Sequence, residues 1–278
     1  GPHVGVSGDG FHLISAAAAV RNETRGKVHR REDGLGLAFR GYLLEPPLHH
    51  FSTASSLLAF WAPQPLERLN GVFAAAVADP EASRLLLYTD ALGMAPIYYT
   101  IFEGHVLFAT KPDWLITTAT ALDPVGPASL AAAGFPVGDR SLLSGVHRVP
   151  PGTRMRFEAS TEPRVERWHD AGSFPPPETP LDRAALELVE TRLDQAIDRC
   201  RALDYGREQL PLSSGYDSRR ILASLVRRGD RPECTTVRVF IKGRRDLDAV
   251  YGREICRRFD CPHRIIELPE PKAYARDD

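Results

Sequence analysis

Short apolar runs that end near glycine or proline recur through residues 1–168 of the chain. Runs of this length, bounded by turn residues, are typical of β-strands. The pattern predicts strands at 35–40, 72–78, 85–89, 97–101, 105–110 and 154–158, with helix-like segments at 52–61, 111–117 and 127–133. We therefore expect sheets with helices packed outside them in this part of the chain.

From residue 182 the pattern changes to helices that alternate with strands. The first helix is expected at about 182–203, and the stripe predicted to be buried is Leu186, Val189, Leu193, Ile197 and Cys200. Strands are then predicted at 210–212, 235–240 and 264–268, with helices between them at 219–228 and 247–259. This alternation predicts a parallel sheet, and such sheets bind ligands at the carboxyl ends of their strands.

A proline-rich segment separates the two patterns. Residues 170–181 read Asp-Ala-Gly-Ser-Phe-Pro-Pro-Pro-Glu-Thr-Pro-Leu, a composition that favours a stiff, extended chain. We therefore predict two domains, at 1–169 and 182–278, joined by a linker at 170–181.

Composition narrows the range of functions. The 278 residues are enough for two domains, and the 43% that are hydrophobic can form real cores. The 35 basic and 36 acidic residues nearly cancel, which argues against a general attraction to nucleic acid or a membrane surface. No apolar run approaches the roughly 18–20 residues of a membrane span, and no signal peptide is evident. The cysteines lack zinc-type or disulfide spacing, so we expect plain thiols and a cytoplasmic protein.

The turn before the helix at 219–228 carries the most informative polar residues. It reads Leu212-Ser213-Ser214-Gly215-Tyr216-Asp217-Ser218. A strand–turn–helix unit directs backbone N–H groups and a helix N-terminus at one spot, which favours an anion there. The serine hydroxyls add donors, and Asp217 can hold a divalent cation against phosphate oxygens. The alternatives are serines that cap the helix and an Asp217 that only offsets the helix dipole.

This segment resembles the pyrophosphate loop S-G-G-x-D-S of the ATP pyrophosphatases, with Ser214 in place of the first glycine. Members of that family release pyrophosphate and leave AMP on an activated carboxylate. The resemblance implies ATP and Mg²⁺ as cofactors, with Asp217 as the metal ligand. The ATP-binding residues that it implies are Leu212, Ser213, Ser214, Gly215, Tyr216, Asp217, Ser218 and Val239.

Further segments resemble the asparagine synthetase family, in that family's order. Residues 69–79 are similar to L-N-G-x-F-A-F-A-x-x-D, residues 85–99 to L-x-L-x-R-D-x-x-G-x-K-P-L-Y-Y, and residues 138–152 to G-D-x-T-L-F-x-G-I-x-x-L-P-P-G. The acidic turn and helix at 246–259, followed by Phe259 to His263, also look like that family's pattern. The resemblance implies an α/β protein of two domains. The first is an αββα Ntn-amidotransferase-like sandwich, and the second is a parallel-sheet, Rossmann-like ATP-pyrophosphatase (PP-loop) domain, incomplete in this chain.

The glutaminase residues of that family are absent. Glutamine-hydrolysing members begin C-G-I-x-G, whose cysteine is the nucleophile, whereas this chain has Val4-Gly5-Val6-Ser7-Gly8. Their N-G-E loop, which holds the glutamine, corresponds here to Arg40-Gly41-Tyr42. We therefore expect no glutamine hydrolysis, and the catalytic residues stay unassigned.

Loss of the glutaminase implies another source of nitrogen. Two branches of the family, β-lactam synthetases and lasso-peptide cyclases, adenylate a carboxylate that an amine of the same molecule attacks. The resemblance therefore implies an AMP-forming amide-bond synthetase, with lasso-peptide macrolactam cyclase as the leading interpretation. β-Lactam synthetase and ammonia-dependent asparagine synthetase are alternatives, and a non-catalytic module that binds a partner protein or peptide is an alternative of another class. The implied partners are ATP, a peptide or small-molecule carboxylate, and a leader peptidase or precursor-peptide-binding protein.

Several neighbouring residues have two interpretations each. Asp248 either contacts Mg²⁺-pyrophosphate or caps its helix, and Arg219 and Arg220 either contact phosphate or are solvated. His263 is expected to be structural, Tyr98 and Tyr99 to be core residues, and His49 and His50 to lie in a loop. Because the family's synthetase domain extends further than this chain, we also expect a truncated enzyme or one half of a split enzyme.

Overall fold

The computed structural model describes residues 3–8, 11–16, 27–30, 35–45, 69–117, 120–158, 162–170, 172, 182–203, 206, 208–239 and 246–268. For residues 3–30 and for Val239 it describes the backbone alone. The chain divides into two compact units, Gly1–Pro176 and Pro177–Asp278, and the division falls within the proline-rich segment.

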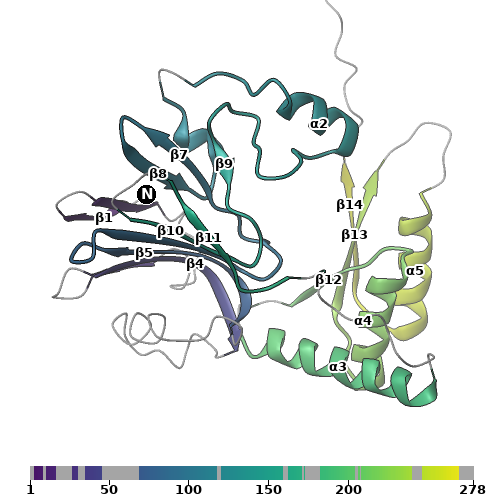
Figure 1. The fold of residues 1–278 in the computed structure, drawn as a ribbon. Coiled ribbons are helices and arrows are strands. Elements are labelled where there is room, and N and C mark those ends of the chain that lie inside the picture. The colour runs from purple at the N-terminus through teal and green to yellow at the C-terminus, as the bar shows by residue number, and fades with distance from the viewer. Residues whose placement is uncertain are drawn as a thin grey trace, which may run out of the picture. The chain divides into compact units, whose positions relative to one another are not determined.

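The first unit is built on a six-stranded sheet with the order β11-β10-β6-β5-β4-β3 (Figure 1). Every neighbouring pair in it is antiparallel. Its strands are β3 (Lys27–Arg30), β4 (Gly36–Glu45), β5 (Asn70–Asp79), β6 (Arg84–Thr89), β10 (Thr153–Phe157) and β11 (Arg164–Arg167). A separate antiparallel hairpin joins β1 (His3–Gly8) to β2 (Phe11–Ala16).

A second, three-stranded sheet packs against the first. It has the order β8-β7-β9 and comprises β7 (Tyr98–Phe102), β8 (His105–Ala109) and β9 (His147–Arg148). Ala76, Leu87 and Phe157 of the large sheet are buried together with Ile97 and Tyr99. The opposite face of the large sheet is also buried, through a cluster that includes Leu37, Phe73 and Val77. Side chains buried on both faces explain why the strands of this sheet read as apolar runs.

The predicted strands of this unit are confirmed, most of them with shifts of one or two residues and β4 with a longer extension at its end. The predicted helix at 127–133 is α2 (Gly126–Ala133). The expectation of a helix at 111–117 is wrong, since only a 3₁₀ turn, η3 (Pro112–Leu115), forms there. Its continuation is prevented because Ile116 is extended and the Thr117 amide donates to Thr120 Oγ1 at 2.8 Å. The predicted helix at 52–61 and the pair His49-His50 lie outside the described residues.

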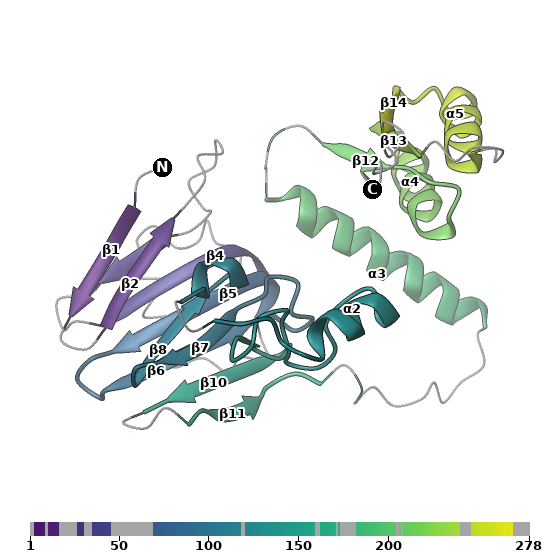
Figure 2. The same ribbon diagram turned by 90° about the horizontal axis from the view of Figure 1, so that it is seen from above.

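The second unit contains a three-stranded sheet, β12-β13-β14, in which both pairs are parallel. Its elements are α3 (Arg183–Arg201), β12 (Gln209–Pro211), α4 (Tyr216–Arg227), β13 (Glu233–Val239), α5 (Leu247–Phe259) and β14 (His263–Leu268). Helices α4 and α5 lie beside one face of this sheet (Figure 1 and Figure 2). Their side chains enclose a core that includes Leu222, Leu225, Cys234 and Cys256. The predicted parallel strand–helix alternation is therefore confirmed.

The prediction of a buried apolar stripe on α3 is wrong for most of its residues. Leu186 and Val189 are 49% and 55% exposed and Cys200 is exposed, while Leu193 and Ile197 are half-buried. Ile197 packs against the core cluster of the second unit as expected, but the rest of the side of α3 that meets α4 is acidic. Its carboxylates pair with arginines of the α4 region in four contacts: Glu190 with Arg220 and Arg227, Asp194 with Arg227, and Asp198 with Arg228. Apolar periodicity alone misplaced the packed side because charged residues also repeat at the helical spacing.

None of the helices within the described residues combines the length and apolar character that crossing a bilayer requires.

Candidate functional site

The serine-rich turn lies at the carboxyl end of β12, where α4 begins. Leu212 is buried, and its backbone ties the turn to β13 in both directions. The Leu212 amide donates to the Thr235 carbonyl at 2.8 Å, and the Thr236 hydroxyl donates to the Leu212 carbonyl at 2.8 Å. The start of the turn is therefore fixed to the centre of the parallel sheet.

Two serines close the turn. The Ser213 amide donates to Ser218 Oγ at 3.1 Å, and the two hydroxyl oxygens are 3.0 Å apart. The Gly215 amide donates to Ser213 Oγ at 3.2 Å. These bonds hold the turn in one shape and leave Gly215 as the N-cap residue of α4.

The N-terminus of α4 differs from those of its two neighbours. Asp182 caps α3 by accepting from the Ala185 amide at 2.7 Å, and Asp246 caps α5 by accepting from the Ala249 amide at 3.1 Å. Among the described residues, no side chain caps α4. The first N–H groups of a helix need a partner, and an uncapped helix N-terminus is suited to an anion.

Asp217 lies in the first turn of α4 and is exposed. Within the described part of the chain, no group of three or more histidine, cysteine or acidic side chains is placed to hold a metal ion. Mg²⁺ bound by one carboxylate, with phosphate oxygens and water as its other ligands, is the usual arrangement in nucleotide sites. An exposed carboxylate beside an uncapped helix N-terminus fits that arrangement.

Asp248 approaches this turn from α5. Its Oδ1 accepts from the Ser214 amide at 2.7 Å and from the Ser214 hydroxyl at 2.5 Å. These hydrogen bonds, chiefly the one from the hydroxyl, lower the pKa of the Asp248 carboxyl below its ordinary value. The capping role considered for Asp248 is wrong, because Asp246 caps α5. No local sequence pattern predicts the contact, but parallel strands place the carboxyl ends of β12 and β13 side by side.

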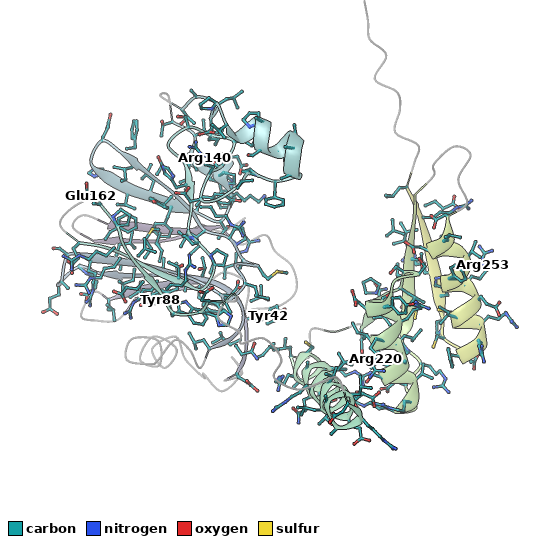
Figure 3. The ribbon with its side chains drawn as sticks, turned by 45° about the vertical axis from the view of Figure 1, so that its right-hand side comes forward. Tyr42, Tyr88, Arg140, Glu162, Arg220 and Arg253 are labelled. Carbon is teal, nitrogen blue, oxygen red and sulfur yellow. The ribbon has the colours of Figure 1, made fainter. Side chains whose placement is uncertain are left out.

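The two arginines after the turn have partners of their own. Arg219 lies 4.7 Å over the ring of Tyr216 and donates to the Gly215 carbonyl at 3.1 Å. Arg220 donates to Glu190 of α3 at 2.6 Å, and Figure 3 shows it at the contact between α3 and α4. Arg219 is therefore held against the turn by its own backbone and ring contacts, whereas Arg220 is directed to α3. Val239, the remaining predicted site residue, ends β13, and its side chain lies outside the described residues.

Of the residues expected to be structural, His263 and Tyr99 are as expected, and Tyr98 is less buried than a core residue. His263 Nε2 lies 2.9 Å from Thr236 Oγ1, and burial together with the nearby Arg253 lowers the pKa of its imidazole. Tyr99 is buried between the two sheets of the first unit, whereas Tyr98 is half-buried.

Cys234, Cys256 and Cys261 are buried, and burial raises the pKa of the Cys234 thiol to about 12. Cys200 is the exposed thiol of α3. Because the thiolate is the reactive form, we expect one of the four cysteines to react quickly with Ellman's reagent at about pH 8. Cys200→Ser should abolish this fast phase, and a fast phase that survives the substitution would contradict the assignment.

The positions that the resemblance matches to glutaminase residues lie in β1 and β4. Val4 belongs to β1, where its backbone pairs with Ser15 of β2, and its side chain is outside the described residues. In β4, the Arg40 guanidinium donates to Thr110 Oγ1 at 2.6 Å. Gly41 has φ +118°, and a Cβ there would lie 2.0 Å from the Val72 carbonyl oxygen. Arg40 and Tyr42 therefore flank a position that only glycine can occupy.

Sequence reasoning missed the role of Asp90. It is 1% exposed and follows β6 directly. Its carboxylate accepts from four backbone amides, those of Phe73, Leu92, Met94 and Ala95, at 2.9–3.3 Å. Asp90 thus orders the turn between the two sheets, and an aspartate two residues before Leu-Gly is the signal that could have indicated it.

Comparisons with known proteins agree with the first unit. Residues 52–169 match the family model of the glutamine amidotransferase domain. The chain contains a glutamine amidotransferase-like domain. A curated relative, amidase chyE of Penicillium rubens, is 25% identical over 189 residues, which are 60% of this chain and 25% of the relative. The chain thus spans about a quarter of that relative's length.

The glutamine phosphoribosylpyrophosphate amidotransferase from B. subtilis, solved with ADP and GMP, superposes with a TM-score of 0.33 and 11% identity. The superposition covers 91% of this chain and 50% of that one. A TM-score this low establishes no shared fold. The prediction of an amidotransferase-like first domain is confirmed by the family match, and the second unit is interpreted from its own residues.

Proposed function

We propose that this chain is part of an ATP-dependent, AMP-forming amide-bond synthetase. The observation that carries the proposal is the turn at 212–218. It joins a strand of a parallel sheet to a helix whose N-terminus no described side chain caps. Its sequence resembles a pyrophosphate loop, and its position at the carboxyl end of a parallel strand is where such sheets bind ligands.

The proposed reaction has two steps. The substrate carboxylate attacks the α-phosphorus of ATP. Pyrophosphate leaves, and the product is an acyl-adenylate. An amine then attacks the acyl carbon, AMP leaves, and the nitrogen loses a proton. The first N–H groups of α4 would bind phosphate oxygens, and Asp217 would hold Mg²⁺, whose charge offsets theirs.

We further propose that the amine belongs to the same molecule as the carboxylate. Val4 offers no nucleophilic atom, and Arg40 and Tyr42 replace the amide and the acid that would hold glutamine. An intramolecular amine has a high effective concentration, so the enzyme need not release ammonia. The specific reaction we propose is macrolactam closure of a lasso peptide in a cytoplasmic biosynthetic pathway, on a precursor that a leader peptidase or binding protein delivers.

The glutaminase half of the proposal has its own prediction. Incubation with glutamine should release no glutamate above a boiled control at any enzyme concentration, because the nucleophile and the acid are both missing. Val4→Cys with a free N-terminus should also be inactive, since Arg40 and Tyr42 still lack the groups that bind glutamine. Glutamate release by the unmodified protein would contradict this part of the proposal.

Calorimetric titration of the full chain with ATP and Mg²⁺ tests the synthetase half. Binding is expected, and turnover should yield AMP and pyrophosphate. Formation of ADP would overturn the pyrophosphate-loop interpretation. Absence of ATP binding would favour the alternative of a non-catalytic module that binds a partner protein or peptide.

A further inference from the structure

The serine turn has an internal carboxylate partner that its proposed role does not require. One oxygen of Asp248 accepts both hydrogen bonds that Ser214 donates, at 2.7 Å from the amide and 2.5 Å from the hydroxyl. Asp248 lies in the first turn of α5, on a different helix from the one that the turn begins. The contact therefore joins the amino ends of two helices across the carboxyl edge of the sheet.

The contact determines which donors of the turn are available. With its amide and its hydroxyl both given to Asp248, Ser214 is not a phosphate donor in this arrangement. The Ser213 and Gly215 amides are bound within the turn. The donors left to an incoming anion are those of the first turn of α4, which no side chain among the described residues caps.

Both partners of the contact are anchored to the same strand. The turn is tied to β13 through the Thr236 hydroxyl and the Leu212 carbonyl. Helix α5 approaches that strand closely at Gly252, where a Cβ would come within 2.8 Å of Thr236 Oγ1. Asp248 and Ser214 therefore belong to elements that both pack against β13 at Thr236, and their contact can hold the turn in a fixed orientation.

We infer that Asp248 is a positioning residue that holds the serine turn open for phosphate through Ser214. The inference rests on the proposed ATP-binding function of the turn. It also explains Ser214, which stands where the resembled loop has glycine. Glycine would keep the amide bond to Asp248 but lose the hydroxyl bond, and it would add backbone freedom. Serine makes the turn more rigid, and rigidity lowers the entropic cost of binding.

The test compares ATP affinity across a set of variants of the full chain by calorimetry with Mg²⁺. Asp248→Ala is expected to weaken binding about tenfold and Ser214→Gly about threefold, as loss of charge-assisted bonds would. The double variant should bind no more weakly than Asp248→Ala, since both changes remove one contact. Asp248→Asn keeps an accepting oxygen and should restore most of the affinity. Glu254→Ala, an exposed carboxylate change on the same helix, is the matched control.

Unchanged affinity in Asp248→Ala, or additive losses in the double variant, would overturn the inference. Tighter binding in Asp248→Ala would also overturn it, by showing that the carboxylate obstructs the phosphate site. Hydrogen exchange of the peptide covering 212–218 separates this inference from the proposed function. If the unmodified chain binds no ATP, the proposed function is wrong. Hydrogen exchange of this peptide then decides whether Asp248 positions the turn. Faster exchange in Asp248→Ala than in Glu254→Ala supports that role, and equal exchange overturns it.

Discussion

Asp217→Ala is expected to lower substrate-dependent AMP formation about 10²-fold in the complete enzyme, a loss of about 2.7 kcal/mol of transition-state stabilisation. The substitution removes the carboxylate proposed to hold Mg²⁺ beside the first turn of α4. Folding should be nearly unaffected because the Asp217 side chain is exposed. The measurement is AMP and pyrophosphate release with saturating substrate, together with the thermal midpoint of unfolding.

Glu254→Ala provides the control for this change. Glu254 is also an exposed carboxylate on a helix of the second unit, and it pairs with Arg257 of the same helix. Its substitution should leave AMP formation within about twofold, as expected for an exposed ion pair. Near-normal AMP formation by Asp217→Ala would show that the metal site lies elsewhere.

Asp90→Ala is expected to reduce the free energy of unfolding of the first unit by about 3 kcal/mol or more. The carboxylate is buried and accepts from the amides of Phe73, Leu92, Met94 and Ala95. Alanine would remove the acceptor of these four hydrogen bonds, and buried N–H groups that lose a partner are costly. Asp90→Asn keeps one accepting oxygen, so its free energy of unfolding should lie between those of the unmodified protein and Asp90→Ala.

Tryptophan fluorescence during urea unfolding reports the stability of the first unit separately from that of the second. All three tryptophans, Trp61, Trp114 and Trp168, belong to residues 1–176, and Trp168 stacks on Phe73 at 6.5 Å. Glu166→Ala breaks a half-exposed pair with Arg154 in the same unit and should cost less than about 1 kcal/mol. A cost for Asp90→Ala as small as that of Glu166→Ala would contradict the role of Asp90 in ordering the turn.

The elements that depend on short stretches of sequence were predicted best. Apolar runs placed β4, β5, β6 and β10 of the large sheet, because a strand needs only its own residues and a buried face to be recognised, but they did not indicate the polar edge strands β3 and β11. The segment at 111–117 was not placed correctly, since the Thr117 amide donates to the Thr120 hydroxyl, and this bond competes with the helix there. The stripe on α3 failed for another reason. Its apolar and acidic residues share the helical period, and the arginines that select the acidic side lie 30 to 37 residues later in the chain.

The sequence by itself determined the βαβαβ order of the second unit, the serine turn at the first of its strand ends, and the absence of a cysteine at Val4. These are local features, read from periodicity and residue chemistry. Only the tertiary structure decided that Asp246 caps α5, that Asp248 therefore reaches Ser214, and that α4 is left without a side-chain cap among the described residues. The physical reason is that a hydrogen bond between side chains on different helices depends on the register of the strands between them, which no local pattern contains.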